Sequence, residues 1–360
     1  MYNSILFSKF SPIIYKKYDE YNKKNLINFP DELKSKYYDY ALYDYNFPRP
    51  LLTLLGINYN ANTLDEINLN FPTDNLIFIP QILRDSFAIV DDVLDGDIEK
   101  FGKPTIPVSF SKYFNNEEIN ILGQSVAILF GDYLMGTLYK FIENLDTNSE
   151  EKLDIYSLVN NVIINTTLAE INGMLLQKKA LHELSKNEIL KLYECKAADY
   201  CYAFPYELGL IHSHAPLKLK NEIREILLKI GVLSQVIDDL IGIFPEAIDN
   251  QKNTISDLLK MRRTFILVYF YETNKKENIK NILEKNTCNE KDALLIKKEM
   301  IMSGFIKNIN NLFSNEITNI KDKINNISIG EISKEYLLNT VDTRITKTYH
   351  TILKNIDQVL

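Results

Sequence analysis

Apolar residues recur along this chain at steps of three and four, with polar and charged residues between them. This is the period of an amphipathic helix, whereas a strand would alternate apolar and polar positions. The pattern predicts long helices at residues 79–94, 119–145, 155–176, 189–212 and 219–243. Segments rich in Gly, Pro, Asp and Asn separate them, as expected for turns. The stretch 315–329, rich in Asn, Lys and Ile, fits either a polar-faced helix or a loop.

Nothing in the sequence marks a boundary between domains. There is no internal repeat, no Gly/Ser-rich linker and no shift in composition, and glycine and proline are sparse, at 12 and 11 residues. An all-helical fold can fill 360 residues as one unit. The prediction is a single all-α domain over residues 1–360.

Composition and charge exclude several classes of protein. Hydrophobic residues make up 46% and charged residues 25%, as in soluble globular proteins. The net charge of -7 argues against nucleic acid as the main partner, because phosphate binding needs a basic face. The three cysteines and four histidines lack the spacing of a disulfide framework or a zinc site. We find neither a secretory signal nor a run of about 18 apolar residues, so we expect no transmembrane segment and a cytoplasmic location.

A first cluster of carboxylates ends one predicted helix. Asp91 and Asp95 are four residues apart and share a helix face, with Asp92 beside them. Clustered carboxylates repel one another unless a cation lies between them. The apolar residues 87–90 before them place the acids toward a cavity, where oxygen ligands with room for water and phosphate suit Mg²⁺. Taken alone, the same pattern fits a solvated acidic face equally well.

A second acid pair, Asp238 and Asp239, closes another apolar helix, with Gln235 one turn before. Two acid pairs that end two apolar helices predict a site in which metal ions and a diphosphate are held together. Cations near the motifs are candidates to take up the remaining phosphate charge: Lys100, Lys196, Lys252, Arg262 and Arg263.

From Arg49 to Thr264 the chain resembles the trans-isoprenyl diphosphate synthase superfamily. The matching residues occur in the family's order: Asp91, Asp92 and Asp95, then 102–105, Gly131 with Asp132, 196–205 with Ala197 in place of Thr, Gln235 with Asp238 and Asp239, and Lys252, Ser256, Asp257, Arg262 and Thr264. The resemblance implies an all-α isoprenoid synthase bundle around a central active-site cavity. It also implies a prenyl diphosphate substrate, Mg²⁺ as cofactor, with three ions expected, and a homodimer.

The departures from the family pattern bear on a second substrate. Elongating members hold the diphosphate of isopentenyl diphosphate in a separate basic pocket. At the corresponding positions this chain has Asn46 for Lys, Arg84 for His or Gln, and Phe101 for Arg, although Arg49 remains. A diphosphate needs several cationic donors to offset its desolvation. These replacements therefore favour ionisation of one prenyl diphosphate without a second diphosphate substrate.

The second acid motif also departs from the family, with Gly242 at its third acidic position. The run from Asp238 to Glu246 resembles the metal motif of class I terpene synthases, in which Asp238 and Glu246 would share one magnesium ion. Pro245 removes a helix hydrogen bond just before Glu246, so a loop position for Glu246 is equally consistent with the sequence.

The sequence thus favours a class I terpene synthase on this scaffold, acting on farnesyl or geranylgeranyl diphosphate. The catalytic residues expected are Asp91, Asp92, Asp95, Asp238, Asp239 and Lys196. The diphosphate contacts expected are Lys100, Lys196, Gln235, Lys252 and Arg262, and the metal ligands Asp91, Asp95, Asp238, Asp239 and Glu246. Three aromatic residues, Phe87, Tyr200 and Phe204, are expected to line the cavity, where ring faces favour a carbocation.

Two alternatives stay open at this point. One is a prenyl diphosphate synthase, or a prenyltransferase that uses another acceptor. The other is a non-catalytic subunit that regulates an active synthase, which the intact first acid cluster argues against.

Overall fold

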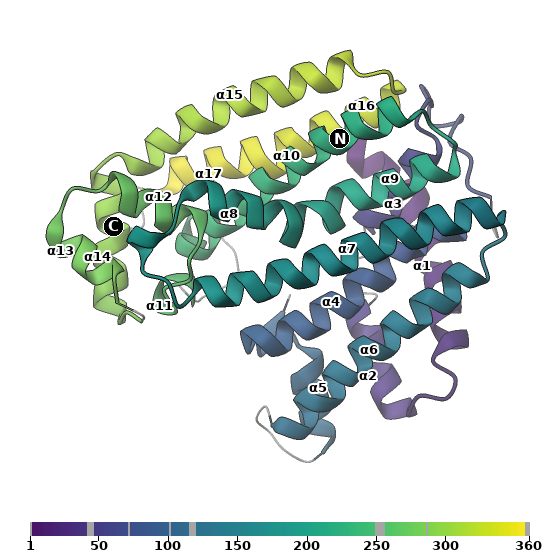
Figure 1. The fold of residues 1–360 in the computed structure, drawn as a ribbon, viewed down its shortest axis with the longest axis horizontal. Coiled ribbons are helices and arrows are strands. Elements are labelled where there is room, and N and C mark those ends of the chain that lie inside the picture. Colours follow the sequence, from purple (N-terminus) through teal and green to yellow (C-terminus); the bar gives the residue numbers. More distant parts are fainter. Residues whose placement is uncertain are drawn as a thin grey trace. The chain divides into compact units, whose positions relative to one another are not determined.

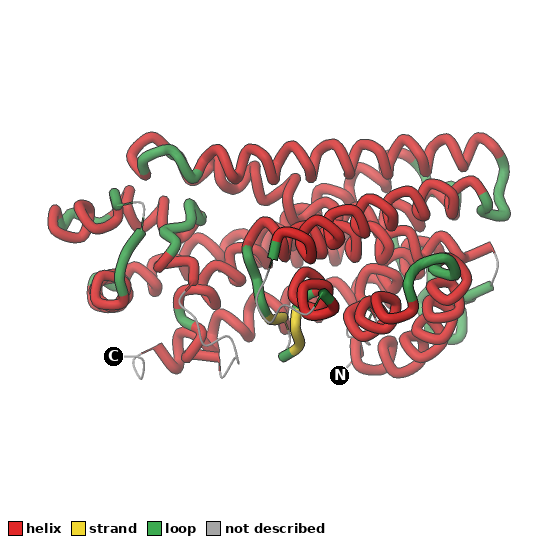
Figure 2. Tube along the Cα trace, turned by 90° about the horizontal axis from the view of Figure 1, so that it is seen from below, coloured by secondary structure: helices red, strands yellow, loops and turns green. Residues whose placement is uncertain are grey.

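In the computed structural model the chain is almost entirely helical, with one short pair of strands (Figures 1 and 2). The structure describes residues 2–41, 47–70, 73–100, 102–114, 120–248, 256–285 and 287–356. These residues group into two compact units, Met1–Val159 with Phe204–Pro216 and Gly330–Ser333, and Asn160–Ala203 with Leu217–Ile329 and Lys334–Leu360. The all-α fold class is confirmed, while the assignment of residues 1–360 to one domain stays a prediction.

The first unit contains the amino-terminal helices and the helix that carries the first acid cluster. Its elements are α1 (Tyr2–Asn25), α2 (Asp31–Ala41), α3 (Pro48–Ile57), η1 (Thr73–Phe78), α4 (Ile79–Asp95), β1 (Glu99–Lys100), β2 (Lys103–Pro104), α5 (Ile106–Tyr113), α6 (Ile121–Glu143), the first part of α7 (Ser149–Leu176), α9 (Phe204–His212) and the start of α16 (Glu331–Thr340).

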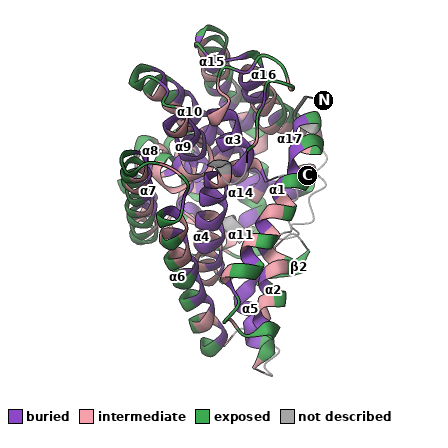
Figure 3. Cartoon of the chain, turned by 90° about the vertical axis from the view of Figure 1, so that its right-hand side faces the viewer, coloured by how far each residue is buried: buried purple, intermediate pink, exposed green. Residues whose placement is uncertain are grey.

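Helix α4 is the centre of this unit and packs along α6, as Figure 1 shows. It is buried over most of its length, whereas α6 exposes one side (Figure 3). Gly131 allows the close approach, because a Cβ there would lie 2.9 Å from Val90 Cγ2 on α4. Helices α3 and α9 cross even more tightly, at Gly56 and Gly209. Glycines thus permit the close packing of α6 on α4 and of α3 on α9.

The second unit contains the remaining helices. Its elements are the rest of α7, η2 (Leu181–Glu183), α8 (Lys186–Tyr193), the π-helix η3 (Glu194–Ala203), α10 (Leu217–Ile243), η4 (Pro245–Ile248), α11 (Ser256–Leu259), α12 (Phe265–Thr273), α13 (Glu277–Leu283), α14 (Glu290–Met302), α15 (Phe305–Asn326), most of α16, the π-helix η5 (Val341–Lys347) and α17 (Thr348–Asn355).

Helix α10, which carries the second acid cluster, packs closely against the π-helix η3. A Cβ on Gly231 would lie 2.5 Å from Ala198 Cα, so only glycine permits this distance. Pro205 follows the π-helix and has no amide proton for the carbonyl four residues earlier, which favours a wider turn at this point. The π-helix therefore replaces part of the single α-helix predicted at 189–212.

The other long predicted helices are confirmed as α4, α6, α7 and α10, with ends that differ by a few residues. The stretch 315–329 is helical in large part, as the end of α15.

One helix of the described chain, α6, is long and apolar enough to cross a membrane, judged by its length and composition alone. Its mean hydropathy is 1.3 over the most apolar window, of which 33% is buried. The helix also carries Asp132, Lys140 and Glu143. This helix differs from the expectation that the chain has no apolar run of that length, and the cytoplasmic location stays a prediction.

Candidate active site

The first acid cluster lies at the carboxyl end of α4. Asp91 and Asp95 are half-buried and one turn apart on the same helix face, whereas Asp92 is fully buried. Gly96 ends the helix in the left-handed conformation, at φ 66°, and its amide donates to the carbonyl oxygens of Asp92 and Val93. The helix end thus turns the chain toward the β1–β2 hairpin directly after the three acids.

The hairpin supplies a cation to the buried acid. Lys100 Nζ lies 2.7 Å from Asp92 Oδ1, and Lys100 is paired across the hairpin with Lys103. Asp92 Oδ2 is also buried, and none of the described residues donates a hydrogen bond to it. Burial raises the pKa of the Asp92 carboxyl, and Lys100 acts in the opposite direction. An acceptor oxygen in this position suits a bound cation or a hydrogen-bond donor.

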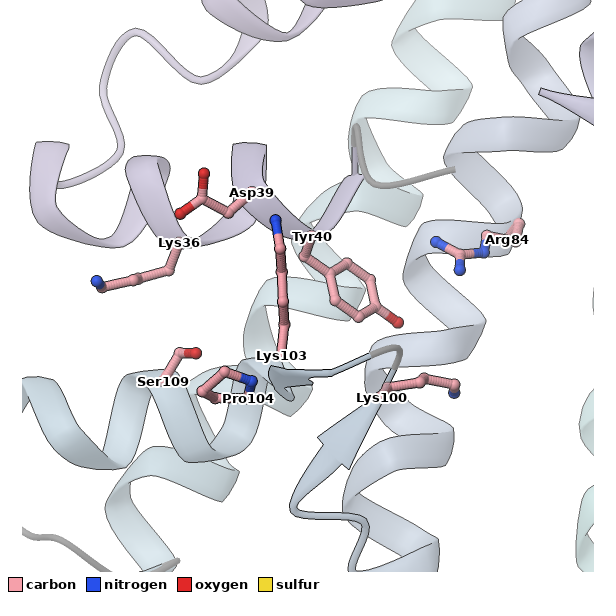
Figure 4. Close-up of a pocket in the computed structure, with 8 residues that line it drawn as sticks. All are labelled: Lys36, Asp39, Tyr40, Arg84, Lys100, Lys103, Pro104 and Ser109. Carbon is pink, nitrogen blue, oxygen red and sulfur yellow. The ribbon is translucent and has the colours of Figure 1, made fainter. Parts of the chain in front are cut away.

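A cavity of about 120 Å³ lies beside this pair and is lined by basic side chains (Figure 4). Its lining residues are Lys36, Asp39, Tyr40, Arg84, Lys100, Lys103, Pro104 and Ser109. In Figure 4 the side chain of Lys103 runs between Lys36 and Tyr40, and the Tyr40 hydroxyl points toward the side of Arg84 and Lys100. The Tyr40 hydroxyl is buried. Four cations and one carboxylate line the cavity, and two of the cations, Lys100 and Arg84, are paired with the buried acids Asp92 and Asp85.

The cavity contains more cations than the sequence predicted for this position. Of the positions compared with the family, Asn46 and Phe101 lie outside the described residues, whereas Arg84 lines the cavity. Lys36 and Lys103 also line it and were not predicted as cations of this site. Lys36 comes from α2, more than 60 residues from the hairpin, so no local motif signals it. The expectation of a site without positive charge for a second diphosphate is therefore not supported by the described residues.

The second acid cluster is held by residues of the second unit. Asp238 is half-buried and accepts a hydrogen bond from Arg344 Nη2 at 2.5 Å. Asp239 is buried, and Tyr193 donates its hydroxyl proton to Asp239 Oδ2 at 2.7 Å. Gln235, one turn before, is half-buried. The two acids thus have different surroundings, although they are neighbours in the sequence.

Glu246 lies beyond the end of α10, because Pro245 begins the short helix η4. Its two carboxylate oxygens lie 2.8 and 3.0 Å from Nζ of Lys297, which is buried. The sequence left open whether Glu246 lies in the helix or past its end, and the structure places it past the end. The ion pair with Lys297 does not favour a metal-binding role.

Two of the other predicted diphosphate contacts, Lys196 and Arg262, lie in the second unit. Lys196 on η3 forms an ion pair with Glu170 of α7 at 2.8 Å. Arg262 is half-buried, and the neighbouring Arg263 is buried, with its guanidinium donating to backbone carbonyls of Lys179 and Met261. Lys252 lies outside the described residues.

Of the three predicted cavity aromatics, Phe87 and Tyr200 are half-buried and Phe204 is fully buried. Phe87 and Phe204 belong to the first unit, and Tyr200 to the second.

The model of the polyprenyl synthetase family matches residues 43–300 of the chain. The chain belongs to the polyprenyl synthetase family. Among curated relatives, a prenyl transferase from Cyanophora paradoxa is 26% identical over 229 residues, and a geranylgeranyl diphosphate synthase from Saccharolobus solfataricus is 26% identical over 227 residues. These alignments cover 64% and 61% of this chain, and 64% and 60% of the length of the relatives.

Solved structures confirm the fold of this family member. The geranylgeranyl pyrophosphate synthase of Corynebacterium glutamicum, complexed with isoprenyl diphosphate and magnesium, superposes with a TM-score of 0.82 at 16% identity. That match covers 94% of this chain and 98% of the other. The geranylgeranyl pyrophosphate synthetase of Geoglobus acetivorans gives a TM-score of 0.74, also at 16% identity, over 94% and 99% of the two chains.

The acids of this polyprenyl synthetase family member fit magnesium when a phosphate ligand shares the coordination. Among the described residues, no group of three or more His, Cys, Asp or Glu side chains is arranged to hold a metal ion. Mg²⁺ is commonly bound by one or two carboxylates together with waters and substrate phosphates. Asp91 and Asp95, one turn apart on one face, supply such a pair, and Asp92 adds a buried oxygen to which none of the described residues donates a hydrogen bond.

Proposed function

We propose that this protein is a prenyltransferase that joins an allylic prenyl diphosphate to isopentenyl diphosphate or a related diphosphate acceptor, with Mg²⁺ as cofactor. The observation that carries this proposal is the cavity lined by Lys36, Arg84, Lys100 and Lys103. A diphosphate needs several cationic donors to replace its hydration. This cavity offers four, of which Arg84 and Lys100 are also paired with the buried acids Asp85 and Asp92. Lys100 connects the cavity to the first acid cluster through its ion pair with Asp92.

The relatives support the same reaction class. A prenyl transferase and a geranylgeranyl diphosphate synthase are among the curated proteins that the chain resembles. In the proposed reaction, the bond between C1 and the diphosphate oxygen breaks, and the electron pair leaves with the diphosphate. The double bond of the acceptor then forms the new carbon–carbon bond to C1, and loss of a proton restores a double bond.

The roles of individual residues follow from their chemistry. Asp91 and Asp95, and Asp238 with Asp239, would hold the Mg²⁺ ions, which supply charge for the leaving diphosphate. Gln235, Lys196, Lys252 and Arg262 remain the proposed contacts to that diphosphate, whereas Lys100, predicted with them, is now assigned to the acceptor cavity. Phe87, Tyr200 and Phe204 remain the proposed apolar walls. A complement of three metal ions also stays a prediction.

The terpene synthase hypothesis, favoured by the sequence, now has less support than its alternative. Its two arguments were the missing cations of a second diphosphate site and the metal ligand Glu246. The cavity supplies cations that the sequence analysis did not count, and Glu246 is paired with Lys297.

One assay separates the two enzymes. The protein is incubated with Mg²⁺ and geranyl, farnesyl or geranylgeranyl diphosphate, with and without isopentenyl diphosphate. We expect a longer prenyl diphosphate that forms only when isopentenyl diphosphate is present. Release of a hydrocarbon or alcohol from the allylic diphosphate alone, at a rate that the acceptor does not change, would contradict the proposal.

We also propose that the protein is a homodimer. In the second unit, α7 exposes Ile164, Leu168, Ile171 and Leu175 by 48 to 55%. Their spacing of three and four residues places them on one helix face, and an exposed apolar stripe of this kind is typical of an interface. Sedimentation should give a dimer for the wild type and a smaller species for Leu168→Glu, whereas a monomeric wild type would contradict the proposal.

A further inference from the structure

Asp85 on α4 is fully buried and accepts hydrogen bonds from four side chains. Its Oδ2 accepts from the hydroxyls of Tyr18 and Tyr37, at 2.8 and 3.0 Å. Its Oδ1 accepts from Gln81 Nε2 at 3.0 Å and from Arg84 Nη1 at 2.9 Å. The donors come from α1, α2 and α4, so this carboxylate connects three helices of the first unit.

The donors favour an ionised carboxylate at this position. Amide and guanidinium N–H groups can only donate, so Asp85 Oδ1 must accept from both Gln81 and Arg84. Burial raises the pKa of the Asp85 carboxyl, but Arg84 and the hydrogen bonds oppose that shift. Burial also raises the pKa of both tyrosines, which therefore keep their protons as donors. A buried carboxylate that accepts hydrogen bonds from four donors is held rigidly in the core.

Arg84 connects the buried Asp85 carboxylate to the cation-lined cavity. Neighbouring residues on a helix point about 100° apart, so the Arg84 side chain must fold back to reach Asp85. Its guanidinium also lies over the ring of Tyr40, 5.3 Å from the centroid, and both residues line the cavity. The side chain of Arg84 is only 12% exposed. Asp85 and Tyr40 therefore restrict the guanidinium to one place on the wall.

We propose that Asp85, held by Tyr18 and Tyr37, is a positioning residue that fixes the Arg84 guanidinium at the cavity wall to bind the diphosphate of the acceptor. This inference rests on the proposed function, because it assigns Arg84 to the acceptor rather than to the allylic substrate. Preorganisation of a long, flexible cation lowers the entropy lost when the anion binds. Asp85 thus acts on acceptor affinity through Arg84, without touching the substrate.

A double-mutant cycle tests the connection between the two residues. In the wild-type background, Asp85→Asn should raise the KM for isopentenyl diphosphate by about tenfold, since a charge-assisted hydrogen bond is lost. The KM for the allylic diphosphate and kcat should change by less than about twofold. In the Arg84→Gln background the same substitution should have little further effect on the acceptor KM. Equal effects in both backgrounds would overturn the inference.

Two further variants separate positioning from folding. Tyr37→Phe keeps the ring and removes one hydrogen bond to Asp85, so it should show the same pattern at about threefold if Asp85→Asn does not fold. Glu151→Gln alters another buried acid of the first unit, which pairs with His212 and does not line the cavity, and should leave the acceptor KM unchanged. Equal Tyr37→Phe effects with and without Arg84 would also overturn the inference.

A binding measurement distinguishes failure of this inference from failure of the proposed function. Inorganic pyrophosphate is titrated calorimetrically into the protein without Mg²⁺, so that metal-dependent binding does not contribute. Weaker binding in Asp85→Asn than in the wild type, with no such difference in the Arg84→Gln background, supports the inference even if no acceptor-dependent turnover is found. Unchanged pyrophosphate binding in Asp85→Asn would overturn it even in an active prenyltransferase.

Discussion

Arg344 Nη2 lies 2.5 Å from Asp238 Oδ1, so a cation near the carboxyl end of the chain is paired with the second acid cluster. Arg344 lies on the π-helix η5 and Asp238 on α10, 106 residues apart in the sequence. Both side chains are about two-fifths exposed. A metal ion that binds Asp238 must therefore compete with a partly solvated ion pair.

Removal of Arg344 should make magnesium easier to bind. An ion pair of this exposure contributes up to about 1 kcal/mol, so Arg344→Gln should lower the half-saturating Mg²⁺ concentration by about two- to fivefold. The activity is measured as a function of Mg²⁺ at saturating substrates. Lys229→Gln, which breaks a comparable ion pair with Glu316, serves as the control and should leave the requirement unchanged. A higher half-saturating Mg²⁺ concentration in Arg344→Gln would argue that Asp238 does not bind the metal.

The first acid cluster should be essential for turnover and dispensable for folding. Asp91→Asn and Asp95→Asn are each expected to lower kcat by about 100-fold or more, because they remove charge that holds the metal at the developing anion. Circular dichroism should be unchanged. Glu99→Gln, on the exposed first strand of the hairpin, should retain activity. If Asp91→Asn stays as active as the wild type, the cluster has no catalytic role.

The crossing of α3 and α9 should not tolerate a side chain. A Cβ on Gly56 would lie 2.2 Å from the Tyr206 carbonyl oxygen, so Gly56→Ala should lower the free energy of unfolding by about 1–3 kcal/mol. At Gly136 on α6 such a Cβ would meet no described atom within 4 Å beyond the backbone of its own helix, so Gly136→Ala should raise the free energy of unfolding by about 0.5–1 kcal/mol. Urea unfolding measures both. Similar changes in the free energy of unfolding for Gly56→Ala and Gly136→Ala would contradict the close crossing of α3 and α9.

Asp199 on η3 should make stability depend on pH. Burial raises the pKa of its carboxyl above the ordinary 3.8, although Arg224, at 2.6 Å, acts against this shift. Between the pKa of 3.8 in the unfolded state and the raised pKa in the folded state, the folded protein binds more protons than the unfolded protein. Its stability therefore falls as pH rises through this window. Asp199→Asn lacks this dependence.

The melting temperatures of the wild type and Asp199→Asn are compared from about pH 4 to neutral pH. The difference in favour of the variant should grow as pH rises. A constant difference over this range would mean that the Asp199 carboxyl is not perturbed in the folded protein.

The sequence alone was sufficient to predict the features that depend on a local repeat of apolar residues. The three- and four-residue steps in α4 and α10 predicted both helices, and the acids at their ends followed from the same pattern. Both helices bury one apolar face, so the period of the sequence reports directly on their packing.

Features that depend on distant segments could not be predicted. Lys36 joins the cavity only because α2 packs near the hairpin, and the partner of Glu246 is Lys297, 51 residues away. The burial of Asp85 likewise depends on tyrosines of α1 and α2. The π-helix η3 could not be predicted either, because its apolar spacing hardly differs from that of an α-helix over one or two turns.

The central claim is that the cation-lined cavity receives the diphosphate of a second substrate. It is tested most directly by calorimetric titration of the protein with isopentenyl diphosphate. We expect saturable binding to the wild type. The affinity should weaken by about tenfold in Lys36→Ala and in Lys103→Ala, because each substitution removes one charge-assisted contact. It should be unchanged in Lys9→Ala, because Lys9 does not line the cavity. Absence of saturable binding, or equal affinity in all four proteins, would contradict the account.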